Sequence, residues 1–170
     1  MPAGTTAGQR VTLRRATAAD VPAIWSVRTR AIRSGCQGYY PEDILESWAS
    51  NPMPSTFDSL IQTEPYYVAE SQSGVVGFAG LKRTPSELDA VFVAPDRARC
   101  GIGMRLLCHV EAVARDLGLV ELTLKASLNS VPFYQRAGYS QGANGTHSTT
   151  SGLQIACVHM GKSLVGEAGI

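Results

Sequence analysis

The sequence predicts an α/β, or α+β, fold on three observations. Short runs alternate apolar and polar side chains, or are continuously apolar, as strands do; they are residues 11–15, 66–70, 75–82, 87–93, 120–125 and 153–162. Residues 102–117 instead place apolar side chains at spacings of three and four, which is typical of an amphipathic helix. Glycine and proline punctuate the boundaries between these segments.

The N-terminal third of the chain predicts two helices. The first begins near Asp20, with Pro22 in its first turn, and ends at Gly35. The second is short, running from about Pro41 to Trp48, and a proline-rich loop follows it. Near the other end of the chain, residues 140–152 are dominated by Gly, Ser, Thr and Asn, which predicts a flexible connection before the last strand.

The length and composition predict one compact domain. A chain of 170 residues with 44% hydrophobic residues is long enough to bury a single core. We expect that domain to span residues 10–164. Residues 1–9, rich in Gly, Ala and Thr, are predicted to be a disordered N-terminal tail, and residues 165–170 a C-terminal tail.

The charge and the cysteines narrow the classes of partner and location. Fifteen Lys and Arg against fourteen Asp and Glu give a net charge of +1, which argues against a nucleic-acid partner and favours a small molecule. No signal peptide or membrane-spanning run is predicted. The four cysteines and three histidines show no metal-binding spacing and no disulfide framework. We therefore expect a cytoplasmic protein without a metal.

The start of the long helix is a predicted anion site. Gly101 and Gly103 leave the backbone bare where a helix begins, and its unpaired N–H groups and positive dipole end favour phosphate. The run lacks the Lys-Ser or Lys-Thr pair of a P-loop. It also has Leu106 where a dinucleotide-binding turn needs its third glycine. The sequence therefore argues against both a P-loop and a dinucleotide-binding turn at this position.

Two segments together resemble the GCN5-related N-acetyltransferase (GNAT) superfamily. Residues 91–107, with V-x-P followed by an arginine-containing run and G-I-G-x-x-L-L, resemble its motif A. Residues 126–139, with Tyr134 followed by Gly138 and Tyr139, resemble its motif B. The resemblance covers about residues 10–164. It implies a mixed, mainly antiparallel sheet of six or seven strands, splayed after the fourth strand, with helices on both faces.

The resemblance also implies a cofactor, acetyl-CoA, and residues that bind it. The loop of motif A holds the pyrophosphate mostly through backbone amides, with a flanking arginine adding charge. Backbone N–H groups near the splay hold the thioester carbonyl. The implied cofactor-binding residues are Phe92, Val93, Arg99, Cys100, Gly101, Ile102, Gly103, Met104, Ser127 and Asn129.

Three residues are predicted to act in catalysis. Tyr134 matches the motif B tyrosine, which the resemblance implies is the general acid for the departing thiolate. Glu87 aligns with a catalytic glutamate of some family members, and Asp89 could share its task as a base. Strand alternation predicts that Glu87, Asp89, Val91 and Val93 lie on one face. Solvated strand carboxylates and a core tyrosine are the alternatives.

The implied activity is acetyl transfer from acetyl-CoA to an amine, by direct attack in a ternary complex. The acceptor cannot be identified from the sequence, although Tyr39, Tyr40 and Trp48 are candidates for its pocket or for the core. Ala98 and Ser127 depart from the family pattern. A catalytically weak or inactive acyl-CoA-binding sensor is therefore the second hypothesis. A homodimer is expected on family habit alone.

Overall fold

The structure, a computed structural model, describes residues 10–166. The predicted N-terminal tail and the end of the predicted C-terminal tail, residues 167–170, lie outside the described residues. The helices are α1 (Val21–Gly35), α2 (Glu42–Ala49), α3 (Phe57–Thr63), α4 (Ile102–Asp116) and α5 (Val131–Arg136), with 3-10 turns η2 (Ala18–Asp20), η3 (Pro95–Arg97) and η4 (Leu128–Ser130). The strands are β1 (Thr12–Arg15), β2 (Tyr66–Ser71), β3 (Gly74–Lys82), β4 (Glu87–Val93), β5 (Glu121–Ala126), β6 (Ser140–Ser148) and β7 (Gln154–Ser163).

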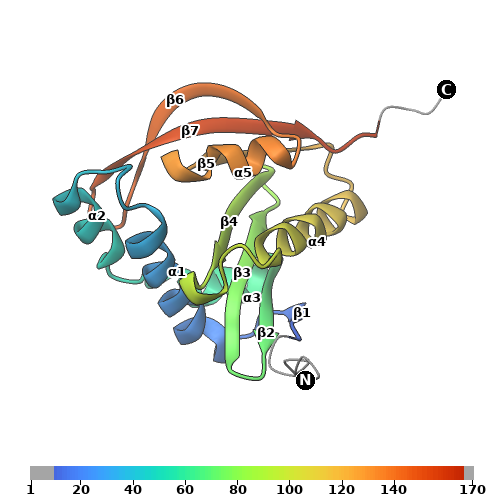
Figure 1. Ribbon diagram of the computed structural model, residues 1–170. Coiled ribbons are helices and arrows are strands. Elements are labelled where there is room, and N and C mark those ends of the chain that lie inside the picture. Colours follow the sequence, from blue (N-terminus) through green and yellow to red (C-terminus); the bar gives the residue numbers. More distant parts are fainter. Residues whose placement is uncertain (1–9, 167–170) are drawn as a thin grey trace, which may run out of the picture.

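The strands form one open sheet in the order β1-β2-β3-β4-β5-β7-β6. All neighbours are antiparallel except β4 and β5, which are parallel. These two strands are joined at a single register pair, Glu87 with Thr123, so they diverge beyond that point (Figure 1). The predicted mainly antiparallel sheet, splayed after its fourth strand, is confirmed.

Helices cover both faces of the sheet, as predicted. On one face α4 packs against β2, β3 and β4 through Leu106 and Val110, and Tyr134 of α5 and Tyr139, which follows that helix, join the same cluster. On the other face α1 packs through Ile24 and Val27. Figure 1 shows α1 and α4 on opposite sides of β3 and β4. The C-terminal end of β4 therefore lies between helix α1 on one face of the sheet and helix α4 on the other.

A β-bulge changes which residues of β4 share a face. Gly80 pairs with Ala90 and the next residue of β3, Leu81, pairs with Leu88, so Asp89 is an extra residue in β4. The alternation of side chains reverses at such a bulge. The prediction that Glu87 and Asp89 face the same way as Val91 and Val93 is therefore wrong. The two valines pack in the cluster under α4, whereas Asp89 contacts Tyr66 on the α1 side.

Two elements differ from the sequence prediction. Residues 140–148 form the edge strand β6, paired with β7, instead of a flexible connection. Its side chains are mostly exposed, so main-chain hydrogen bonds hold it without a hydrophobic pattern. Gly145 leaves room for His159 of β7, because a Cβ there would lie 2.5 Å from its Nε2 atom. Helix α3 was not predicted at all, although Ile61 is buried.

Candidate active site

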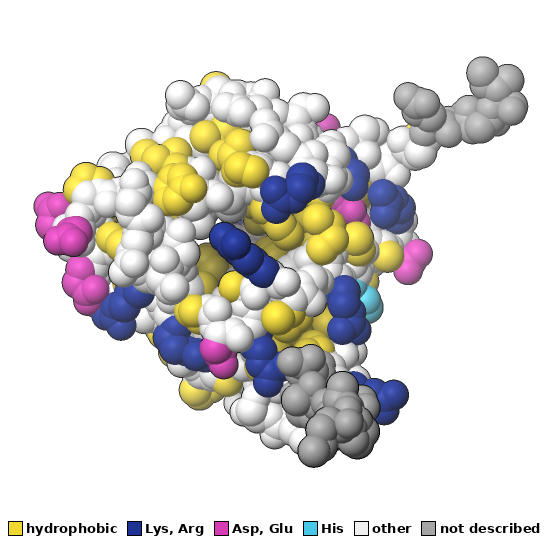
Figure 2. Space-filling view, in the orientation of Figure 1, with side chains coloured by type: hydrophobic (Ala, Val, Ile, Leu, Met, Phe, Trp, Pro, Cys, Tyr) yellow, Lys and Arg dark blue, Asp and Glu magenta, His cyan; other side chains and the backbone are white. Residues whose placement is uncertain are grey.

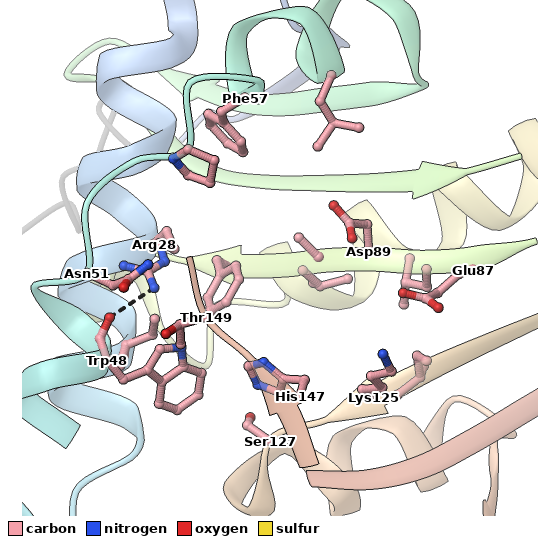
Figure 3. A pocket seen from close by; sticks show the side chains of 18 of the residues that line it. Arg28, Trp48, Asn51, Phe57, Glu87, Asp89, Lys125, Ser127, His147 and Thr149 are labelled. Carbon is pink, nitrogen blue, oxygen red and sulfur yellow. Dashed lines mark hydrogen bonds between the residues drawn. The ribbon is translucent and has the colours of Figure 1, made fainter. Parts of the chain in front are cut away.

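A cavity of about 480 Å³ opens where β4 and β5 diverge. Its walls come from α1, the segment from α2 to α3, β4, the end of β5 and the turn after β6 (Figure 3). Aromatic residues Trp25, Trp48, Phe57 and Phe92 line much of it. A cavity of this size and lining is typical of a small-molecule site.

All three predicted catalytic residues, Tyr134, Glu87 and Asp89, line this one cavity. Because of the bulge at Asp89, both carboxylates lie on the face of β4 opposite the one that packs Val91 and Val93 under α4. Tyr134 comes from α5, beyond the gap between the strands. The divergence of β4 and β5 thus brings two carboxylates and a phenol to one space.

The two carboxylates have different surroundings. Asp89 accepts a hydrogen bond from the Tyr66 hydroxyl and lies 3.2 Å from Nζ of Lys82. Gly80 permits this contact, because a Cβ at that position would collide with the Tyr66 ring. Within residues 10–166, Glu87 forms no salt bridge. Glu87 is therefore the carboxylate with its oxygens available to the cavity.

Tyr134 is buried and its hydroxyl makes no hydrogen bond within the described residues. Its ring packs edge-on against Phe133 and Tyr139, at centroid distances of 5.1 and 5.7 Å. Burial raises the pKa of the phenol above its usual value, because the charged form would be desolvated. The phenol is therefore protonated at neutral pH and can donate.

A buried ionic network that the sequence did not reveal fixes α5. The Tyr139 hydroxyl donates to Glu111 of α4 at 2.8 Å, and Nζ of Lys162 lies 3.0 Å from the same carboxylate. Lys162 also donates to the carbonyl of Ala137, at the end of α5, at 2.8 Å. Glu111 is only 4% exposed. These bonds tie the helix that carries Tyr134 to the neighbouring layers.

The predicted anion-binding loop has an unusual backbone. Arg99 and Gly101 both adopt left-handed conformations, with φ of 63° and 80°, and α4 begins at the next residue. Turns of this kind expose successive N–H groups that bind anions, and the first N–H groups of α4 have no partner within the helix. Left-handed geometry is strained for a residue such as Arg99. The strain marks this loop as a candidate binding site.

The remaining loop residues lie beside the end of β4. A Cβ on Gly103 would be 3.5 Å from Val93 and from Phe133, so the loop adjoins both the strand end and α5. Cys100 is exposed, with Sγ 3.6 Å from the carbonyl of Ala98. Ile102 is buried and Met104 partly buried in the cluster under α4. Figure 2 shows a hollow in this face, with hydrophobic side chains at its floor and Lys and Arg side chains around it.

The two motif B residues lie in different places. Ser127 lines the cavity and donates to Oγ of Ser130 at 2.9 Å. Asn129 is not among the cavity residues, and its side-chain oxygen instead accepts from the Cys36 thiol at 3.2 Å. Asn129 thereby ties η4 to the segment after α1. The structure does not bring it together with the loop.

The three aromatic residues predicted for the acceptor pocket or the core, Tyr39, Tyr40 and Trp48, occupy different environments. Trp48 lines the cavity and Tyr39 is 54% exposed. Tyr40 is buried, and its hydroxyl bridges the N–H of Leu128 and the carbonyl of Ala156. Tyr40 is therefore a core residue that connects the segment before α2 with η4 and β7.

Sequence reasoning missed the four cavity residues with basic side chains, namely Arg28 of α1, Lys82 of β3, Lys125 of β5 and His147 of β6. Arg28 had a detectable signal, because it lies four residues from both Ile24 and Ile32 and so interrupts the apolar stripe of its helix. Lys125 and His147 had none. They belong to segments that only the folded sheet brings together.

Two structural searches over the described residues were negative. No group of three or more His, Cys, Asp or Glu side chains in residues 10–166 is arranged to hold a metal ion. In the same part of the chain, no helix combines the length and the apolar character that crossing a bilayer requires.

A family model described as "Acetyltransferase (GNAT) domain" matches residues 38–164. The chain therefore belongs to the GNAT acetyltransferase family, as its two motifs predict, and is an acyltransferase. A comparison with curated proteins finds no match.

Solved structures show the same fold. A Rhodopseudomonas palustris protein described as "GCN5-Related N-acetyltransferase: Aminotransferase, Class-II" is 28% identical, with a TM-score of 0.79 over 89% of this chain and 94% of its own. The PaiA N-acetyltransferase of Thermoplasma acidophilum, in complex with coenzyme A, is 20% identical, with a TM-score of 0.68 over 91% and 99%. The putative acetyltransferase YncA of Salmonella typhimurium, with acetyl-CoA, is 19% identical, with a TM-score of 0.63 over 95% and 98%.

Proposed function

We propose that the protein is an N-acetyltransferase that moves an acetyl group from acetyl-CoA to an amine by direct attack in a ternary complex. The supporting observation is the shared cavity, which has Glu87 on β4 and the Tyr134 phenol on α5. Family membership supports the same reaction class. No cysteine lines the cavity within the described residues, which favours direct transfer over a thioester on the enzyme.

The loop before α4 fits the diphosphate of acetyl-CoA. Its left-handed residues, Arg99 and Gly101, and the helix start present backbone N–H groups to an anion. Residues 98–101 are exposed, so a ligand can reach them. When bound, acetyl-CoA supplies an activated acetyl thioester. Cys100, Ile102, Gly103 and Met104 would contribute backbone groups or packing beside the diphosphate.

Backbone groups of β4 supply the oxyanion contacts in this proposal. The N–H of Ala94 donates to Val76 of β3, so the N–H of Phe92 points to β3 as well. The N–H of Val93 then points to the open edge where β5 has diverged. We therefore assign the carbonyl contact to Val93, while Phe92 provides the aromatic wall.

Glu87 is the proposed base. An amine must lose a proton before or during attack, and a carboxylate can take it directly or through water. Glu87 lacks a salt bridge within residues 10–166, whereas Asp89 is held by Tyr66 and Lys82. Asp89 is thus better suited to orienting its neighbours than to accepting a proton.

Tyr134 is the proposed acid. Tyr134 lines the cavity, its hydroxyl has no hydrogen-bond partner within residues 10–166, and burial keeps the phenol protonated, so it can donate to the departing thiolate. The network of Tyr139, Glu111 and Lys162 positions the helix that carries it. Ser127, which lines the cavity at the start of the same segment, would support the cofactor side, whereas Asn129 is held away from it by Cys36.

Turnover and binding together test the proposal. Acetyl-CoA should raise the melting temperature, and at 100 times its dissociation constant it would add about 2.7 kcal/mol of stability. A panel of amines, amino acids and peptides should then include an acceptor that releases free thiol. An absence of any stabilisation by acetyl-CoA would contradict the proposal at its first step.

The second candidate is an acyl-CoA-binding sensor without turnover. Ala98 offers no side-chain contact to the diphosphate, and Asn129 is engaged by Cys36 away from the cavity. A sensor would bind acetyl-CoA but release no thiol with any acceptor. The substitution Tyr134→Phe would then change neither property. The homodimer and the cytoplasmic location remain predictions, as does the single domain over residues 10–164.

A further inference from the structure

Arg28 is a buried cation without a carboxylate partner. It is 9% exposed, and its guanidinium donates to the carbonyls of Trp48 and Ala49 at 3.0 and 3.1 Å. No carboxylate within the described residues lies within salt-bridge distance of it. A buried charge without a counter-charge is destabilising. The burial of this unpaired charge therefore suggests a function in ligand binding.

A structural role accounts for only part of this side chain. The two carbonyls lie at the end of α2, where a cation is favourable, and the guanidinium stacks 4.3 Å from the ring centre of Trp25. These contacts use two of the five N–H groups that an arginine carries. Arg28 also lines the cavity, next to Asn51 and Trp48 (Figure 3). Its remaining donors are available to a ligand there.

The charges around the cavity favour a ligand with an anionic group. Three cations, Arg28, Lys82 and Lys125, face two carboxylates, Glu87 and Asp89. Lys82 is paired with Asp89, whereas Lys125 has no salt bridge within residues 10–166. The unpaired groups are therefore two cations and Glu87. This pattern matches a molecule that carries one anion and one amine.

The pKa of His147, on β6, is also affected by the positive charges around the cavity. Burial lowers the pKa of its imidazole, and the charges of Lys125 and Arg28 lower it further. The ring packs against Trp48 at a centroid distance of 5.7 Å, inside the cavity. A neutral imidazole adds no charge of its own, so the three cations outnumber the two carboxylates of the cavity and an anionic ligand is favoured.

We propose that the amine acceptor is a small amino carboxylate with an apolar side group, and that Arg28 binds its carboxylate. This inference rests on the proposed function and specifies its substrate class. The Nε–H of Arg28 and a second N–H on each terminal nitrogen have no partner within the described residues, so a pair of charged donors remains for a carboxylate. The cavity's aromatic lining accommodates the apolar group, and Glu87 lies on the β4 wall for the amine. Polyamines and aminoglycosides, which carry several cations, fit this charge pattern poorly.

Matched pairs of acceptors test the proposal. Each pair contains an amino acid and the same amine without its carboxylate: L-phenylalanine and phenethylamine, L-leucine and 3-methylbutylamine, and 5-aminovalerate and butylamine. The wild-type protein should prefer the carboxylate in at least one pair, by about ten- to a hundredfold in kcat/KM, which is the range for hydrogen bonds to a charged group. A preference for the plain amines, or for neither member, would overturn the inference.

Binding of the products gives a test without turnover. N-acetyl-L-phenylalanine and N-phenethylacetamide, titrated by calorimetry into the protein, should show the same preference for the carboxylate. Equal affinity or no binding of either would overturn the inference. Stabilisation by acetyl-CoA, measured in parallel, keeps the two proposals distinct, because it reports on the cofactor loop alone.

Three variants assign the preference to Arg28. Arg28→Met should abolish it, and Arg28→Lys should reduce it strongly because lysine lacks the fork. Lys125→Met, at an exposed position that leaves folding intact, should weaken it by about threefold. If Arg28→Met does not fold, Arg28→Lys decides. A folded Arg28 variant that keeps the full wild-type preference would show that the carboxylate binds elsewhere.

Discussion

The two sides of the cavity are built in different ways. The proposed cofactor side, from the end of β4 through the loop to α4, is one continuous segment, and its candidate site depends on backbone conformation. The proposed acceptor side is assembled from α1, the α2–α3 segment and β6, and its charge and shape depend on single side chains such as Arg28 and His147. A backbone site leaves a motif in the sequence. A side-chain site from scattered segments does not.

The largest expected effect comes from Tyr134→Phe. Loss of a general acid should lower kcat by about 10²- to 10⁴-fold. Stability should hardly change, because the hydroxyl makes no hydrogen bond within the described residues. Steady-state kinetics and a melting curve measure both. The matched control is Tyr139→Phe, which removes the bond to Glu111 and should lower the free energy of unfolding by about 1.5–3 kcal/mol.

Glu87→Gln and Asp89→Asn separate the two carboxylates. The first should lower kcat/KM by about 10²-fold or more, at wild-type stability, since general-base catalysis contributes this much. The second should lower the melting temperature, because it breaks the ion pair with Lys82 and weakens the contact with Tyr66. If Glu87→Gln instead retained full activity while Asp89→Asn lost it without unfolding, the roles assigned here would be exchanged.

The glycines of the loop distinguish backbone strain from ligand contact. Gly101→Ala forces alanine into a left-handed conformation and should lower stability by about 1–2 kcal/mol. Gly103→Ala meets only ordinary contacts, at 3.5 Å, and should raise the melting temperature slightly because alanine favours the helix. Both should weaken acetyl-CoA binding, measured by calorimetry. Undiminished affinity in Gly103→Ala would mean that the ligand does not approach this backbone closely.

The smallest expected effect is a pH dependence on the acceptor side. The pKa of His147 is lowered in the folded protein, chiefly by burial, so the unfolded chain binds its proton first as pH falls. Stability should therefore decrease below about pH 6.5, the ordinary histidine value. Melting curves between pH 5 and 8 should show a flatter profile for His147→Gln. An identical slope in both proteins would place the titrating group elsewhere.

The same contrast explains what the sequence could predict. The strand, loop and helix around Gly101 were foreseeable because apolar periodicity and glycine placement act locally. Strand β6 was not, because an edge strand with exposed side chains lacks that periodicity and depends on pairing with β7. The bulge at Asp89 was also hidden, since it arises from the register between β3 and β4.

In the candidate site too, the residues that belong to a sequence motif could be predicted, and those brought together only by the fold could not. Tyr134 and Glu87 were identified through motif resemblance, and both line the cavity. The tie between Tyr139, Glu111 and Lys162 joins three distant segments and gave no local signal. Arg28 could have been noticed as a charge within an apolar helical stripe, but its partners at the end of α2 could not.

The central claim is that one cavity brings the amine directly to the acetyl thioester. Initial rates, measured while acetyl-CoA and an accepted amine are varied together, test it most directly. Direct attack in a ternary complex predicts double-reciprocal lines that intersect, and no acetylated protein detectable by mass spectrometry when the amine is omitted. Parallel lines together with a stoichiometric acetyl-enzyme would contradict the account and point to a covalent intermediate.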